Sequence, residues 1–157
     1  MARRVYVETS VWGMIPPDQD RFMRLPSLDF LTRCQQGRVS ACVSHVVFGE
    51  IKLAKPETQK PIWEWVRRVN PTILVVTEEI DALADRFVKE GVVPKRRRDD
   101  ARHVACAVVH GVDLLVIWNY RHIANVRKAE GFNAVAVLAG YSDRLQIHTP
   151  LEVLGWE

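Results

Sequence analysis

Residues 99–119 read DDARHVACAVVHGVDLLVIWN, and this stretch decides the predicted fold. Apolar residues recur at the spacing of one helix face, which predicts a helix that opens at Asp99 or Asp100 and stops at Gly111. The run at 114–118 is apolar throughout, which predicts a strand buried on both faces. A helix that leads straight into such a strand is typical of a sheet whose strands run parallel.

The rest of the chain continues this alternation. Further strands are predicted at 4–8, 39–43, 73–76 and 134–138. Further helices are predicted at 22–36, 45–54, 61–69, 77–91 and 121–130, followed by one helical turn at 149–152. The sequence has no repeat, low-complexity tract or linker, so we predict a single domain spanning 1–157. The pattern predicts an α/β fold, a three-layer α/β/α sandwich with a mainly parallel central sheet.

Composition excludes several classes of protein. The chain is 48% hydrophobic and 26% charged, which suits a globular core with an ordinary surface. It has no run of about 18 apolar residues and no apolar segment near its N-terminus, so we expect neither a membrane span nor a secretory signal, and a cytoplasmic location. The three cysteines form no CxxC pair, so neither a disulfide framework nor a thiolate zinc site is predicted. The net charge of +3 is compatible with an anionic partner but does not indicate one.

Four polar side chains fall where ligands bind in a parallel sheet, beyond the carboxyl ends of the strands. Glu8 ends the first predicted strand and Asn119 follows the strand at 114–118. Glu50 lies within the apolar stripe of its helix, and Asp100 opens the next. Each has a structural explanation taken alone: Glu8 as a solvated strand end, Asn119 as a turn residue, Glu50 as an exposed residue at the edge of the stripe or part of a buried salt bridge, and Asp100 as a helix cap.

The combination of these four residues is more informative than any one of them. Three carboxylates and an amide at one sheet edge make a pocket of oxygen atoms, and Mg²⁺ and Mn²⁺ prefer oxygen ligands. Without a cation, clustered carboxylates repel one another and raise their own pKa values. The sequence therefore predicts a site for a divalent cation.

Three parts of the sequence resemble the PIN-domain ribonucleases, and most closely the VapC-like toxins of bacterial toxin–antitoxin pairs. They are YVETS at 6–10, Glu50, and the stretch 99–119. The resemblance covers essentially the whole chain and implies a Rossmann-like fold and metal-dependent cleavage of RNA. It implies that Glu8, Glu50 and Asp100 are the metal ligands and that Asn119 fills a fourth place in the catalytic site.

The resemblance also implies supporting residues and partners. Ser10 matches a position that orients the first acid, and Thr9 is a second candidate for that role. RNA is the implied substrate, and a homodimer and a small antitoxin protein are the implied protein partners.

Two departures from the family pattern leave a second function open. Glu8 stands where the family usually has Asp, and Asn119 stands where Asp is frequent. The alternative is a catalytically weak or inactive PIN domain that binds RNA or a protein. Other classes fit poorly: no DxDxT follows the first strand, and neither GxGxxG nor GxxxxGK[ST] occurs.

A basic run precedes the aspartates at the start of the helix. It consists of Lys95, Arg96, Arg97 and Arg98. Cations before a helix N-terminus oppose the helix dipole, so the run does not serve helix stability. It either contacts the RNA backbone or forms a solvated loop. The five histidines show no metal-binding spacing such as HExxH, and we expect His103 on the helix surface.

Overall fold

A five-stranded parallel sheet forms the centre of the computed structural model, which describes residues 2–118, 125–142 and 145–155. The strands are β1 (Arg3–Val7), β2 (Val39–Ser44), β3 (Thr72–Leu74), β4 (Leu114–Val116) and β5 (Gln146–His148). Their order is β3-β2-β1-β4-β5, and each neighbouring pair runs parallel. The central strand, β1, aligns Tyr6 with Cys42 on one side and with Leu115 on the other.

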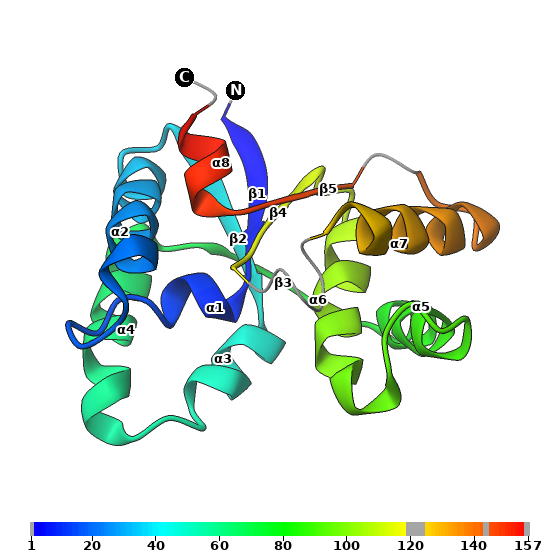
Figure 1. Cartoon of the computed structure of the whole chain (residues 1–157), viewed down its shortest axis with the longest axis horizontal. Coiled ribbons are helices and arrows are strands. Elements are labelled where there is room, and N and C mark those ends of the chain that lie inside the picture. Colours follow the sequence, from blue (N-terminus) through cyan, green and yellow to red (C-terminus); the bar gives the residue numbers. More distant parts are fainter. Residues whose placement is uncertain (1, 119–124, 143–144, 156–157) are drawn as a thin grey trace.

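Helices cover both faces of this sheet (Figure 1). α2 (Arg21–Gln35), α4 (Pro56–Val69) and α8 (Pro150–Leu154) lie on one side, and α5 (Glu78–Lys89), α6 (Arg98–Val109) and α7 (Val126–Leu138) lie on the other. Two short helices, α1 (Thr9–Trp12) and α3 (His45–Ile51), follow the carboxyl ends of β1 and β2. The first turn of α6, preceded by a 3₁₀ turn (Lys95–Arg97), lies at the same edge (Figure 1). The predicted α/β/α sandwich is confirmed.

Local sequence signals account for most helix starts. Ser44, Thr77 and Asn125 each accept a hydrogen bond from a backbone N–H in the first turn of the helix that follows. Thr149 and Glu152 form a reciprocal capping box at α8, where Pro150 takes the first position. The helical turn predicted at 149–152 is therefore confirmed.

The helix end predicted at Gly131 and the strand predicted at 134–138 were wrong, whereas residues 121–124 of the predicted helix lie outside the described residues. Residues 126–138 form a single helix, α7, instead of a helix ended by Gly131 and a strand at 134–138. An apolar run of Ala and Val fits a strand or a buried helix, so its pattern did not distinguish them. Gly131 serves close packing: a Cβ built there would lie 3.3 Å from Val92 Cγ1. The glycine that ends the helix is Gly140, at φ +94°, and the last strand is β5.

The start predicted for the fourth helix was also wrong, because α4 begins at Pro56 and not at residue 61. Pro56 suits the first turn, where no N–H is needed. Pro61 lies inside the helix, and α4 continues through it to Asn70, whose φ of +51° closes the helix in a left-handed conformation.

The cysteines are core residues. Cys34, Cys42 and Cys106 are all free thiols and all buried. Burial raises the pKa of Cys34 and of Cys106 to about 12. In the part of the chain that the structure describes, no helix combines the length and the apolar character needed to cross a membrane.

Candidate functional site

Glu8 occupies the junction between β1 and α1. Its backbone N–H continues the sheet by donating to the carbonyl of Val116 at 3.0 Å. Its side chain caps α1, accepting the Ser10 N–H at 3.2 and 3.1 Å on its two oxygens and the Ser10 hydroxyl at 2.6 Å. Only 6% of the residue is exposed. The first carboxylate of the site is thus held in place by the turn that follows it.

Ser10 links this carboxylate to the end of β4. While its hydroxyl donates to Glu8, the same oxygen accepts the backbone N–H of Trp118 at 2.9 Å. Thr9 does not contact Glu8 in this way; its hydroxyl donates to Glu50 Oε1 at 2.7 Å. Each of the two hydroxyls that follow β1 therefore orients a different carboxylate.

Glu50 projects from α3 toward the same edge. Its side chain is 28% exposed. Oε1 accepts two hydrogen bonds, from Thr9 and from His103 Nε2, the latter at 2.5 Å. Within the described ranges, no residue donates a hydrogen bond to its second oxygen, Oε2. One oxygen of Glu50 is therefore fixed and the other is open to a ligand.

The prediction that His103 lies on the helix surface was wrong, because the structure buries it completely. α6 is packed between the sheet and α5, and His103 to Ala107 are all buried. His103 Nδ1 lies 2.7 Å from the Tyr6 hydroxyl, which in turn lies 2.8 Å from Ser44 Oγ. The sequence held a signal for this: His103 follows Asp100 by three residues, so both lie on one face of the helix.

The structure brings together two of the predicted site residues, Glu8 and Glu50, and adds His103 to them. Glu8, Glu50 and His103 each offer an atom within 4.8 Å of the other two. Asp100 lies one turn before His103 on α6, outside that tight set, and its charge contributes to the raised pKa of His103. Asn119 lies outside the described residues.

Burial and proximity shift the pKa values of all three clustered groups. Burial raises the pKa of Glu8, and the charge of His103 and the Ser10 hydrogen bonds only partly oppose it. Burial alone would raise the pKa of Glu50 as well, but the His103 and Thr9 hydrogen bonds and the His103 charge outweigh it and lower the pKa. Burial alone would lower the pKa of His103, but its bond to Glu50 and the nearby carboxylates raise it. The site thus favours a positive charge beside its carboxylates.

The residues at this edge fit a divalent cation. Glu8 is a nearly buried carboxylate, and such a group needs a compensating cation or hydrogen bonds to stay ionised. A carboxylate oxygen of Glu50 lies within 4.8 Å of one of Glu8, and α6 carries a further carboxylate, Asp100, in its first turn. These are the hard oxygen donors that Mg²⁺ and Mn²⁺ select.

A hollow of about 300 Å³ opens beside Glu50. Val46, Leu53 and Val76 give it an apolar wall, and Asp99 and Arg102 line it with charge. Leu53 is 87% exposed, so it adds apolar surface at the rim of this hollow. A ligand bound at Glu50 would therefore find a partly apolar surface next to it.

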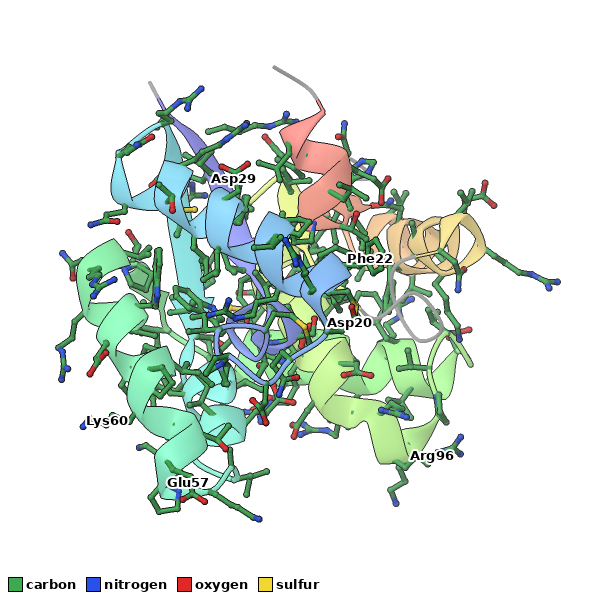
Figure 2. All side chains as sticks on the ribbon, turned by 60° about the vertical axis from the view of Figure 1, so that its left-hand side comes forward. Asp20, Phe22, Asp29, Glu57, Lys60 and Arg96 are labelled. Atoms are coloured by element: carbon green, nitrogen blue, oxygen red, sulfur yellow. The ribbon has the colours of Figure 1, made fainter. Side chains whose placement is uncertain are left out.

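The basic run divides into two parts. Arg98 is the first residue of α6 and pairs with Asp85 at 2.7 Å and with Asp81 at 3.7 Å, so it ties α6 to α5. Lys95 and Arg96 are exposed, and Arg96 lies on the outer surface beside the start of α6 (Figure 2). The exposed part of the run is the part that can meet a phosphate backbone.

The comparisons with known proteins support the fold. No family model matches the chain, and no curated protein matches it. Among solved structures, the chain is similar to a chain of VapBC2 from Rickettsia felis, in a crystal structure bound to a DNA fragment from their promoter. The TM-score is 0.57 at 11% identity, over 93% of this chain and 98% of that one. At this identity the likeness is one of fold, and it agrees with the PIN-like fold expected from the sequence.

Proposed function

We propose that the protein is a metal-dependent endoribonuclease that hydrolyses phosphodiester bonds of RNA. The observation that carries the proposal is the meeting of Glu8 and Glu50 at the carboxyl edge of the sheet, with Asp100 on the adjoining helix. Each of the two glutamates is oriented by its own hydroxyl partner, Ser10 for Glu8 and Thr9 for Glu50. Such pre-orientation of side chains is typical of a binding site.

In this proposal the protein side chains bind and orient the cation. Glu8, Glu50 and Asp100 are the ligands of Mg²⁺ or Mn²⁺, and Asn119 fills the fourth place of the catalytic site. A bound cation supplies activation of water and neutralises the charge that grows on the phosphate and on the leaving oxygen. The water oxygen bonds to phosphorus and loses a proton, the bond to the 3′ oxygen breaks, and that oxygen takes up a proton, so that the net reaction is addition of water. The expected ends are a 5′-phosphate and a 3′-hydroxyl.

A second candidate function is an inactive PIN-like domain that binds RNA or a protein. One observation favours it: the carboxylate of Glu8 is already engaged as the cap of α1 through three contacts with Ser10. A glutamate retained only as a helix cap would give the same local geometry. Cation binding separates the two functions, because a cap needs no metal.

The biological setting is a finer proposal that rests on the likeness to VapBC2. We propose that the protein acts in the cytoplasm as the toxin of a toxin–antitoxin pair, that it forms a homodimer, and that a small antitoxin protein is its partner. A neighbouring gene for a small protein that co-purifies with this chain would support the pairing.

Cleavage of total cellular RNA tests the proposal without assuming a target. The protein is incubated with the RNA in Mg²⁺ or Mn²⁺, and new 5′-phosphate ends are mapped by sequencing. We expect the wild type to produce ends that EDTA abolishes and that Asp100→Asn does not produce.

A matched control for this substitution is Asp29→Asn, because Asp29 is an exposed aspartate on α2 (Figure 2). This variant is expected to cleave like the wild type. Identical ends from the wild type and from Asp100→Asn would contradict the assignment.

A further inference from the structure

We infer that Tyr6 and His103 are positioning residues that hold Glu50 for cation binding, an inference that rests on the proposed function. They form a chain of hydrogen bonds that begins at Ser44 on β2 and ends at Glu50 on α3. The chain runs through β1 and α6, so it joins four elements that meet at the site. Its two middle members, Tyr6 and His103, are fully buried.

The fold itself does not require this buried polar chain. Burying a phenol hydroxyl and an imidazole is costly unless every polar atom has a partner, and apolar side chains of similar size are often as stable in such a place. Both ring nitrogens of His103 have partners, Tyr6 at 2.7 Å and Glu50 at 2.5 Å. This chain of hydrogen bonds leads from the core to one half-buried carboxylate, that of Glu50.

The direction of the last hydrogen bond is fixed by chemistry. An ionised Glu50 only accepts, so His103 Nε2 carries the proton and donates. The Tyr6 hydroxyl can donate to Nδ1 or accept from it, and Ser44 can complete either arrangement. The bond to Glu50 therefore persists whether the imidazole carries one proton or two.

The hydrogen bond from His103 to Glu50 determines which oxygen of Glu50 can bind a cation. His103 and Thr9 both donate to Oε1, which pins a long, flexible side chain in one orientation. Oε2 is then directed away from these donors and is open to a ligand. A hydrogen bond behind a metal ligand typically strengthens metal affinity about 10–100-fold.

Mn²⁺ titration calorimetry on the purified full-length protein tests the inference. His103→Leu removes both hydrogen bonds while filling the space, and we expect it to weaken Mn²⁺ binding about 10–100-fold. His103→Gln keeps an amide donor near the position of Nε2, so we expect it to recover part of the affinity. Tyr6→Phe keeps the buried ring and removes only its hydroxyl, so we expect a smaller loss of affinity.

A structural control separates positioning from stability. Phe132 packs edge-on against Phe87 between α7 and α5, with ring centroids 4.9 Å apart. Phe132→Leu is expected to lower the melting temperature and to leave the Mn²⁺ affinity unchanged. If instead every destabilised variant, Phe132→Leu included, lost affinity in proportion to its lost stability, the positioning role would be overturned.

The outcomes for the wild type and the variants are distinguishable. If the wild type binds Mn²⁺ and the folded His103→Leu and Tyr6→Phe variants bind it equally well, the inference is overturned and the proposed function stands. If His103→Leu does not fold, Tyr6→Phe decides alone, and wild-type affinity in that variant overturns the inference. If the wild type binds no Mn²⁺, the proposed function and the inference are both overturned.

Discussion

The hydroxyl of Ser10 donates to Glu8 across 2.6 Å and accepts the backbone N–H of Trp118 at 2.9 Å. Two residues apart in sequence, Ser10 and Glu8 close a tight turn that begins α1. The same oxygen ties that turn to the residue that follows Ile117 at the end of β4. One side chain thus connects the first acid of the candidate site to the segment that leads to Asn119.

Ser10→Ala is expected to loosen Glu8 and to weaken the site. The change removes one acceptor for a backbone N–H and one donor to a nearly buried carboxylate, which costs about 1–3 kcal/mol of stability. Mn²⁺ affinity should fall as well, because Glu8 loses the bond that orients it. Chemical denaturation and calorimetry measure the two effects.

Ser27→Ala is the matched control for this change. Ser27 is a buried serine whose hydroxyl accepts the indole N–H of Trp118 at 2.7 Å and does not contact Glu8. We expect its loss to lower stability while Mn²⁺ affinity stays at the wild-type level. Equal Mn²⁺ affinities for Ser10→Ala, Ser27→Ala and the wild type would refute the role given to Ser10.

The basic run should separate into RNA-binding cations and a structural ion pair. The double substitution Lys95→Ala and Arg96→Ala removes two exposed cations and is expected to weaken RNA binding. It should also reduce the slope of log affinity against log salt by about 0.7 for each phosphate that the variant no longer neutralises. Arg98→Ala breaks the bridge to Asp85 and should leave that slope nearly unchanged. Binding to single-stranded RNA at several salt concentrations measures the slope for both variants. A larger loss of slope in Arg98→Ala than in the double variant would contradict this assignment of roles.

The buried thiols should make stability depend on pH in alkaline solution. Burial raises the pKa of Cys34 and of Cys106 to about 12, so the folded chain keeps protons that the unfolded chain loses. The unfolded state then binds fewer protons, and the free energy of unfolding falls as the pH rises from the ordinary thiol range toward 12. Urea denaturation across that range tests this, and Cys34→Ala should show a shallower decline.

Thiol reactivity gives an independent reading of the same burial. At pH 8 the three cysteines should react slowly with a disulfide reagent in the native protein and at once in denaturant, since each is buried and uncharged. Rapid modification of the native protein would contradict the packed core around Cys106 and Cys34.

The packing of α7 predicts a coupling between Gly131 and Val92. Alanine is favoured over glycine inside a helix by about 1 kcal/mol, but a Cβ at residue 131 would meet Val92 at 3.3 Å. Gly131→Ala alone should therefore give little or none of that gain. In a Val92→Ala background it should stabilise the protein by up to about 1 kcal/mol. Urea denaturation of the two single variants and the double variant measures the free energy of unfolding. If the two substitutions change that free energy additively, the two residues do not touch.

Local signals in the sequence were sufficient for most of the architecture. The strand–helix alternation and the caps at Ser44, Thr77 and Thr149 predicted the parallel sandwich, because these features depend on residues close together in the chain. The strand predicted at 134–138 was wrong for the opposite reason. An Ala- and Val-rich run fits a strand or a buried helix, and its own pattern does not distinguish them; here it belongs to α7.

In the candidate site too, features that depend on nearby residues were predictable and features that depend on distant contacts were not. The positions of Glu8 at a strand end and of Glu50 on a packing face were readable from periodicity, and the structure brings the two together. Spacing places His103 on the same helix face as Asp100, but its burial depends on contacts with β1 and α3 that form only in the folded chain. Its partners Tyr6 and Glu50 come from distant parts of the chain, and no spacing rule joins them.

The most direct test of the account is calorimetric titration of Mn²⁺ into the wild type and into Glu50→Gln, with Glu57→Gln as the control. Glu57 is an exposed glutamate on α4 (Figure 2). The account predicts that the wild type and Glu57→Gln bind Mn²⁺ alike and that Glu50→Gln loses binding while remaining folded. No binding by the wild type, or equal binding by all three proteins, would contradict a cation site at Glu8, Glu50 and Asp100.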